Sequence, residues 1–137
     1  MLHEDAVKVL APDLQIDDHL RRRVPGRLLE EVVELCLESG QSAKDILGHV
    51  VDSLYAQCRK GDIYPTSLEF LPMRTTVVGE LADVQLLVQY TAFIHQIDPI
   101  EIEEKMAIKV DYLIGRSLRG EAVVYDGLLY AVRQRTS

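Results

Sequence analysis

Apolar side chains recur with a helical period along much of the chain, and each such stretch predicts a helix. The clearest of these helices is predicted over 27–39. Pro25-Gly26 marks its start, and Gly40 marks its end. A second amphipathic helix is predicted over 42–60, with Ser42 as its N-cap. Two strong helices therefore follow one another in the first half of the chain.

The third predicted helix, 76–97, carries apolar residues on nearly every side. A helix of this kind is expected to be buried, and in a chain this small the burial is expected against a second subunit as well as its own neighbours. The pattern thus predicts a homodimer or a homotetramer. A fourth helix is predicted over 98–116, with Asp98 as N-cap and Pro99 in the first position.

Other stretches give weaker patterns. Residues 1–24 predict one or two short helices, and the proline-containing run 62–76 predicts a long loop. In the tail 121–132, Asp126-Gly127 stands between two apolar runs, which indicates a short β-hairpin; a short helix is the alternative. The expected fold is an all-α bundle of about four to five helices, completed by oligomerisation.

Composition is consistent with one domain over 1–137, since 47% of the residues are hydrophobic and the length is that of a single domain. There is no uninterrupted apolar run of membrane-spanning length, so the sequence predicts no transmembrane helix. The N-terminus does not resemble a secretory signal. Cys36 and Cys58 do not have the spacing of a zinc site. Together these features indicate a cytoplasmic protein.

The formal net charge of −7 argues against binding to a nucleic-acid polymer, whose partners are usually basic. A nucleotide substrate is still allowed, because a bound divalent cation can reverse the local field.

The acidic residues of 27–39 fall on one side of that helix. Arg27, Glu31, Glu34 and Glu38 are spaced so that they form a single stripe, and Glu30 lies one turn before Glu34. Taken alone, such a stripe is usually a solvated face.

A second acidic pair changes that interpretation. Glu80 and Asp83 are the only carboxylates of the apolar helix 76–97, and a buried carboxylate is disfavoured unless it is paired or binds a metal. If they faced Glu31 and Glu34, four oxygen ligands would meet at one point. An all-oxygen set suits Mg²⁺, or alternatively Mn²⁺.

These residues also resemble a known family. Residues 30–34 read E-E-V-V-E, an E-E-x-x-E motif, and 80–83 read E-L-A-D, an E-x-x-D motif. In this order they are similar to the signature of the MazG-like, all-α nucleoside triphosphate pyrophosphohydrolases. The segments 96–99 (Q-I-D-P) and 104–106 (E-K-M) are similar too, so the resemblance covers about 27–116. The chain departs from the family in the 45 residues between the motifs and in Asp111, near the expected asparagine.

The resemblance implies that Mg²⁺ bridges the phosphates of a nucleoside triphosphate while water attacks the α-phosphorus, giving a monophosphate and pyrophosphate. Its implied metal ligands are Glu31, Glu34, Glu80 and Asp83. The implied catalytic residues are Glu34 and Glu30, the latter as a supporting group or as the activator of water. Phosphoribosyl-ATP hydrolysis and a non-catalytic, metal-binding helical oligomer are the alternatives.

The phosphate chain of such a substrate would also need cations. Lys105, Lys109 and Arg116 share one stripe of the predicted helix 98–116, where they can contact phosphates or simply form a solvated basic face. Arg27 is either a phosphate ligand or an ion-pair partner of Glu31, and the ion pair is slightly favoured.

Overall fold

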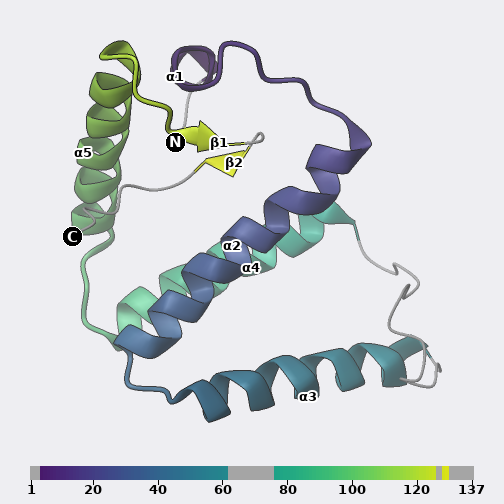
Figure 1. Cartoon of the computed structure of the whole chain (residues 1–137). Coiled ribbons are helices and arrows are strands. Elements are labelled where there is room, and N and C mark those ends of the chain that lie inside the picture. Colours follow the sequence, from purple (N-terminus) through teal and green to yellow (C-terminus); the bar gives the residue numbers. More distant parts are fainter. Residues whose placement is uncertain (1–3, 62–75, 126–127, 130–137) are drawn as a thin grey trace. The chain divides into compact units, whose positions relative to one another are not determined.

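The computed structural model describes residues 4–61, 76–125 and 128–129, and in these ranges the chain is almost entirely helical (Figure 1). The helices are α1 (Glu4–Leu10), α2 (Asp18–Glu38), α3 (Ala43–Gly61), α4 (Val77–Ile94) and α5 (Pro99–Leu118), and the strands are β1 (Val124–Tyr125) and β2 (Leu128–Leu129). The predicted fold class, all-α with about four to five helices, is confirmed.

Helix α2 is longer than the sequence pattern indicates. It begins at Asp18 rather than at Arg27, and it runs through Pro25. The start signal lies upstream, where Asp17 accepts a hydrogen bond from the backbone N–H of Leu20 at 2.8 Å. A proline inside a helix removes one backbone hydrogen bond, and here the helix continues on both sides of it. The prediction that Pro25-Gly26 marks the helix start is therefore wrong.

Three helices end with the chain in the left-handed region. Gly40 closes α2 with φ 94°, and Gly120 follows α5 with φ 84°. After α4 the left-handed residue is instead Gln96, a non-glycine residue with φ 58°. There the N–H of Ile97 donates to the carbonyl of Ala92, which turns the chain out of the helix. This turn ends α4 three residues before the predicted boundary.

Both predicted N-caps are confirmed. The Ser42 hydroxyl accepts a hydrogen bond from the Asp45 N–H at 3.1 Å, while the Asp45 carboxylate accepts one from the Ser42 N–H at 3.0 Å. This reciprocal pair starts α3. Asp98 accepts from the N–H of Ile100, and Pro99 occupies the first position of α5.

The tail forms the hairpin rather than the short helix. β1 pairs antiparallel with β2, with Val124 opposite Leu129 and Tyr125 opposite Leu128. The predicted turn Asp126-Gly127 lies outside the described residues, as does the predicted loop apart from Thr76.

Contacts divide the chain into two compact units, and the single domain over 1–137 stays a prediction. The first unit comprises Met1–Leu29 and Gln89–Ser137. Its core consists of Leu10 from α1, Leu113 from α5 and Val123. The Ser117 hydroxyl of α5 donates to the carbonyl of Val9 at 3.0 Å, which adds a polar contact beside this core.

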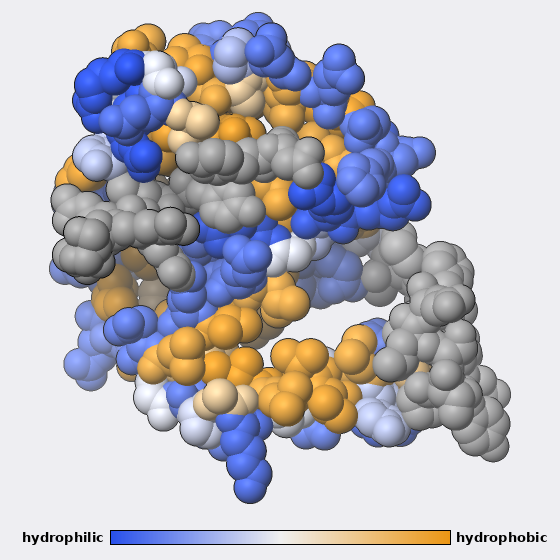
Figure 2. Space-filling view, in the orientation of Figure 1, coloured by the Kyte–Doolittle hydropathy of each residue, from blue (hydrophilic) through white to orange (hydrophobic). Residues whose placement is uncertain are grey.

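The second unit, Glu30–Val88, contains the C-terminal half of α2, all of α3 and most of α4. Cys58 is its only buried residue among those the structure describes. Apolar side chains form a continuous band along α3, seen at the bottom of Figure 2. Because so little apolar surface is covered, this unit has almost no core of its own within one chain.

Helix α4 is mostly exposed in the single chain. Of its described residues only Ala92 is buried. The expectation that α4 packs into the core of its own chain is therefore wrong, and its burial against a second subunit stays a prediction. By length and mean hydropathy, 1.3 over 18 residues, α4 also meets the criteria for a membrane span. The absence of a strictly unbroken apolar run therefore did not exclude such a helix.

Candidate functional site

The acids of the first motif lie in the C-terminal half of α2. Glu31 and Glu34 are half-buried, whereas Glu30 is exposed. Residues three apart on a helix lie on the same side, so Glu31 and Glu34 share one face of α2.

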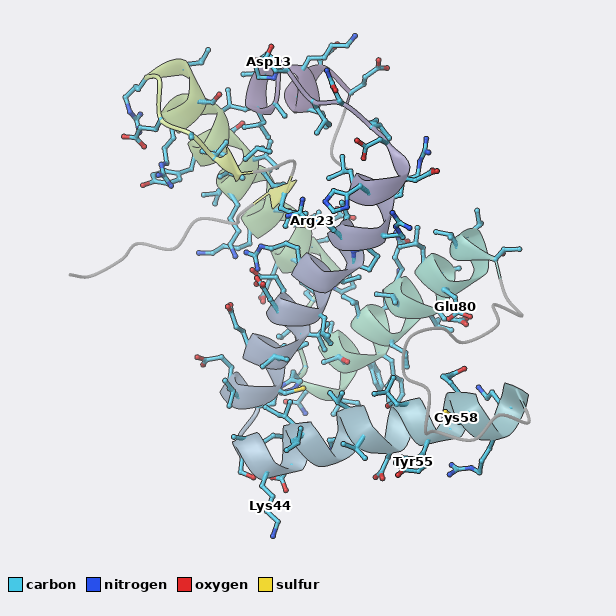
Figure 3. All side chains as sticks on the ribbon, turned by 45° about the vertical axis from the view of Figure 1, so that its right-hand side comes forward. Asp13, Arg23, Lys44, Tyr55, Cys58 and Glu80 are labelled. Carbon is cyan, nitrogen blue, oxygen red and sulfur yellow. The ribbon has the colours of Figure 1, made fainter. Side chains whose placement is uncertain are left out.

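The acids of the second motif lie in the first two turns of α4. Glu80 projects from the beginning of this helix (Figure 3), and both Glu80 and Asp83 are exposed. Thr76 caps this end of the helix through a 3.1 Å hydrogen bond from the Gly79 N–H to its hydroxyl. A helix N-terminus favours negative charge, so this position stabilises Glu80 without a metal. The expectation that these carboxylates are buried is wrong.

Both acidic pairs belong to the second compact unit, Glu30–Val88. Within the ranges that the structure describes, no three His, Cys, Asp or Glu residues form a group that could hold a metal ion. The donor set is still chemically suited to a hard cation, since carboxylate oxygens are the ligands that Mg²⁺ prefers. The structure thus places the four carboxylates on the predicted helices but does not bring them together.

The predicted basic residues belong to the other compact unit. Lys105 and Lys109 are exposed on α5. Arg116, in the last turn of α5, pairs with the carboxylate of Glu121. This hydrogen bond from Arg116 lowers the pKa of Glu121 below its usual value. Arg116 was expected to contact a substrate phosphate, but in the structure its anionic partner is a carboxylate of the same chain.

Arg27 also has a partner that the sequence did not predict. Its Nε donates to the backbone carbonyl of Leu129 at 3.2 Å, so it ties α2 to the C-terminal hairpin within the first unit. An ion pair between Arg27 and Glu31 stays a prediction.

Two features of the first unit were not found from the sequence. Glu121 follows the helix end, so helical periodicity gave no reason to pair it with Arg116. The unit also has an open hollow of about 360 Å³, lined by residues 10–14, Ser117 and 120–124. None of the predicted site residues lines this hollow, so it is not part of the predicted site.

The chain was compared with models of protein families, with characterised proteins and with solved structures, and none of them matches it. The resemblance to the MazG-like pyrophosphohydrolases therefore depends on the motifs at 30–34 and 80–83 and on the segments that follow them.

Proposed function

We propose that the protein is a Mg²⁺-dependent nucleoside triphosphate pyrophosphohydrolase that releases a nucleoside monophosphate and pyrophosphate. The observation that carries the proposal is the pairing of E-E-x-x-E and E-x-x-D on two helices, α2 and α4, of one compact unit. The all-α fold is consistent with the resemblance, although many other functions use all-α folds.

Glu31, Glu34, Glu80 and Asp83 would hold the metal ion, and Glu30 would orient or activate the attacking water. When bound, the metal supplies positive charge that neutralises the phosphates and orients them for attack. The half-buried position of Glu31 and Glu34 favours this role over that of a fully solvated stripe, because partial burial strengthens a carboxylate's interaction with a cation. Holding all four ligands requires the face of α2 and the N-terminal end of α4 to approach each other.

Lys105 and Lys109 stay the candidates that the sequence offers for the β- and γ-phosphates, and both are exposed on α5. Arg116 would have to exchange Glu121 for a phosphate oxygen, and Arg27 would have to release the Leu129 carbonyl. The two lysines are therefore the stronger candidates for binding the phosphate chain.

The test is pyrophosphate release from a panel of ribo- and deoxyribonucleoside triphosphates and phosphoribosyl-ATP, with Mg²⁺ present. Glu34→Gln and Asp83→Asn should each lose activity while their circular dichroism spectra stay helical. Changing groups that merely support metal ligands commonly costs about 10–100-fold, so loss of a ligand should cost at least roughly 100-fold. Asp52→Asn is the matched control, since it removes an exposed carboxylate from α3, outside both motifs.

A second measurement does not depend on turnover. Mn²⁺ binding, followed by electron paramagnetic resonance, should weaken in Glu34→Gln and in Asp83→Asn but not in Asp52→Asn. A wild-type protein that binds Mn²⁺ yet is inert toward the whole panel would favour the non-catalytic metal-binding oligomer. Turnover of phosphoribosyl-ATP alone would favour the role in phosphoribosyl-ATP hydrolysis. A wild type with neither binding nor turnover would refute the proposal.

A further inference from the structure

The outer edge of strand β1 presents backbone groups that its partner strand does not use. Two residues separate Tyr125 from Leu128, so these two residues exchange the hydrogen bonds nearest the turn. The next pair, Val124 and Leu129, therefore points its N–H and C=O groups away from the hairpin. The bond that Leu129 accepts from Arg27 agrees with this orientation on the β2 side. On the β1 side, the outward groups of Val124 have no hydrogen-bond partner among the described residues.

The edge of β1 borders the open hollow of the first unit. Val124 lines this hollow together with 120–123, and residues 10–14 line it from the end of α1 onward. With about 360 Å³, the hollow falls within the size of ordinary ligand sites, roughly 300–1,000 Å³. Leu10 and Val123 are 6% and 3% exposed, and they give the hollow an apolar floor. An occupant can therefore cover apolar side chains there while it meets the backbone of β1.

The rim of the hollow carries one negative charge that is not balanced nearby. Two carboxylates line the hollow, those of Asp13 and Glu121, and both residues are exposed. Glu121 is paired with Arg116, so its charge is balanced within the chain. Asp13, in the segment that follows α1 (Figure 3), forms no ion pair with any described residue. None of the described residues that line the hollow is basic, so its charge favours an occupant with a basic side chain.

We propose that the outer edge of β1 binds an extended segment of another protein as a third strand beside the hairpin. Main-chain hydrogen bonds to Val124 hold this segment. One of its apolar side chains covers Leu10 and Val123, and one of its basic side chains pairs with Asp13. An open hollow encloses too little of a small molecule to hold it firmly, whereas an added strand binds mainly through its backbone. The inference is independent of the proposed catalytic function, because none of the residues proposed for that function lines the hollow.

A strand of alternating apolar and basic residues meets these requirements, because successive side chains of a strand point to opposite faces. The probe is the capped peptide Val-Lys-Val-Lys-Val, added to the isotope-labelled full-length chain and followed by amide hydrogen exchange and amide chemical shifts. At a peptide concentration about ten times its Kd, exchange of the Val124 N–H should slow about tenfold, because only the free edge exchanges. The capped peptide Val-Glu-Val-Glu-Val should bind more weakly, since its carboxylates are repelled by Asp13.

Two variants test the charge and the edge separately. Asp13→Asn should weaken binding of the lysine peptide about two- to fivefold, the size expected for an exposed ion pair. Asp5→Asn is the matched control, because it removes an exposed carboxylate of α1 that does not line the hollow. Val124→Pro removes the outward N–H and leaves the bonds between Tyr125 and Leu128, so the lysine peptide should no longer bind.

Modified peptides keep the proposal testable if Val124→Pro does not fold. Only every second amide of an added strand faces the edge, so N-methylation at the valines and N-methylation at the lysines should differ, with one abolishing binding and the other sparing it. Binding that both methylated peptides retain, or equal binding of the lysine and glutamate peptides, would overturn the assignment. So would a lysine peptide that does not bind. A Val124 N–H that is protected without peptide would overturn it too, because the edge would then be covered by the chain itself or by a second copy.

Discussion

At the scale of single residues, the clearest device is the reciprocal cap that starts α3. The side chain of Ser42 accepts a hydrogen bond from the backbone N–H of Asp45, and the side chain of Asp45 accepts one from the backbone N–H of Ser42. Both N–H groups lie at the helix start, where the helix itself provides no acceptor for them. The hydrogen bonds from the backbone and side chain of Ser42 lower the pKa of Asp45, and nearby His49 adds a smaller effect in the same direction. Ser42 as an N-cap before an amphipathic stretch was enough to predict the position of this helix start, whereas the partnership with Asp45 was not predicted.

The lowered pKa makes the contribution of Asp45 to stability depend on pH. A carboxyl group with a lower pKa in the folded than in the unfolded chain stabilises the fold above its ordinary value of 3.8. That contribution is lost as the pH falls through 3.8 toward the lowered pKa. Asp45→Asn should therefore destabilise the protein near neutral pH, and the difference from the wild type should shrink in acid.

Urea unfolding of both proteins, at neutral pH and again in acid, measures this difference. Asp52→Asn, in the same helix but outside the cap, is the control. If Asp52→Asn showed the same loss of stability at neutral pH and the same convergence in acid, the effect would not come from the cap.

At the scale of elements, helix existence was predictable and some boundaries were not. The apolar period and the caps at Ser42 and Asp98 located α3 and α5, because these signals act within a few residues of the chain. Pro25 misled the prediction for α2, because an interior proline usually ends a helix, whereas α2, which starts upstream at Asp17 and Asp18, continues through it. Gln96 gave no signal at all, because residues other than glycine rarely adopt a positive φ.

A glycine inside α2 and the glycine that follows its C-terminal end should respond in opposite ways to the same substitution. Gly26 lies inside the helix, and an added methyl group would meet no atom within 4 Å. Gly26→Ala should therefore raise the free energy of unfolding by about 0.5–1 kcal/mol. Gly40 ends the helix with φ 94°, where a side chain is strained, so Gly40→Ala should lower it by about 1–2 kcal/mol. Urea titrations measure both, and a destabilised Gly26→Ala would indicate that α2 is interrupted at Pro25.

At the scale of the whole molecule, the sequence was least informative about contacts between distant segments. The bonds from Arg27 to Leu129 and from Ser117 to Val9 join residues more than a hundred positions apart. No local period encodes such pairs. The meeting of Glu34 with Asp83 is a long-range contact of the same kind, and it stays a prediction although each acid lies on its expected helix. The core of the first unit, around Leu113, likewise depends on how the chain returns to α1.

The sparse burial in the second unit predicts that stability depends on protein concentration. Cys58 is the only buried residue described between Glu30 and Val88, so this unit gains little from apolar burial until another surface covers it. If a second copy covers the exposed apolar residues of this unit, the native state is favoured by mass action. A tenfold rise in protein concentration should then stabilise the dimer by about 1.4 kcal/mol.

For a chain of this size, that gain should raise the midpoint of thermal unfolding by several degrees for each tenfold rise in concentration. Circular dichroism melts over a hundredfold concentration range measure the slope. Leu86→Lys, which places a charge among the exposed apolar residues of α4, should melt at a lower and more nearly constant temperature, because the charge disfavours the association that couples stability to concentration. A wild-type midpoint that does not move with concentration would mean that the exposed face of α4 is tolerated in a monomer.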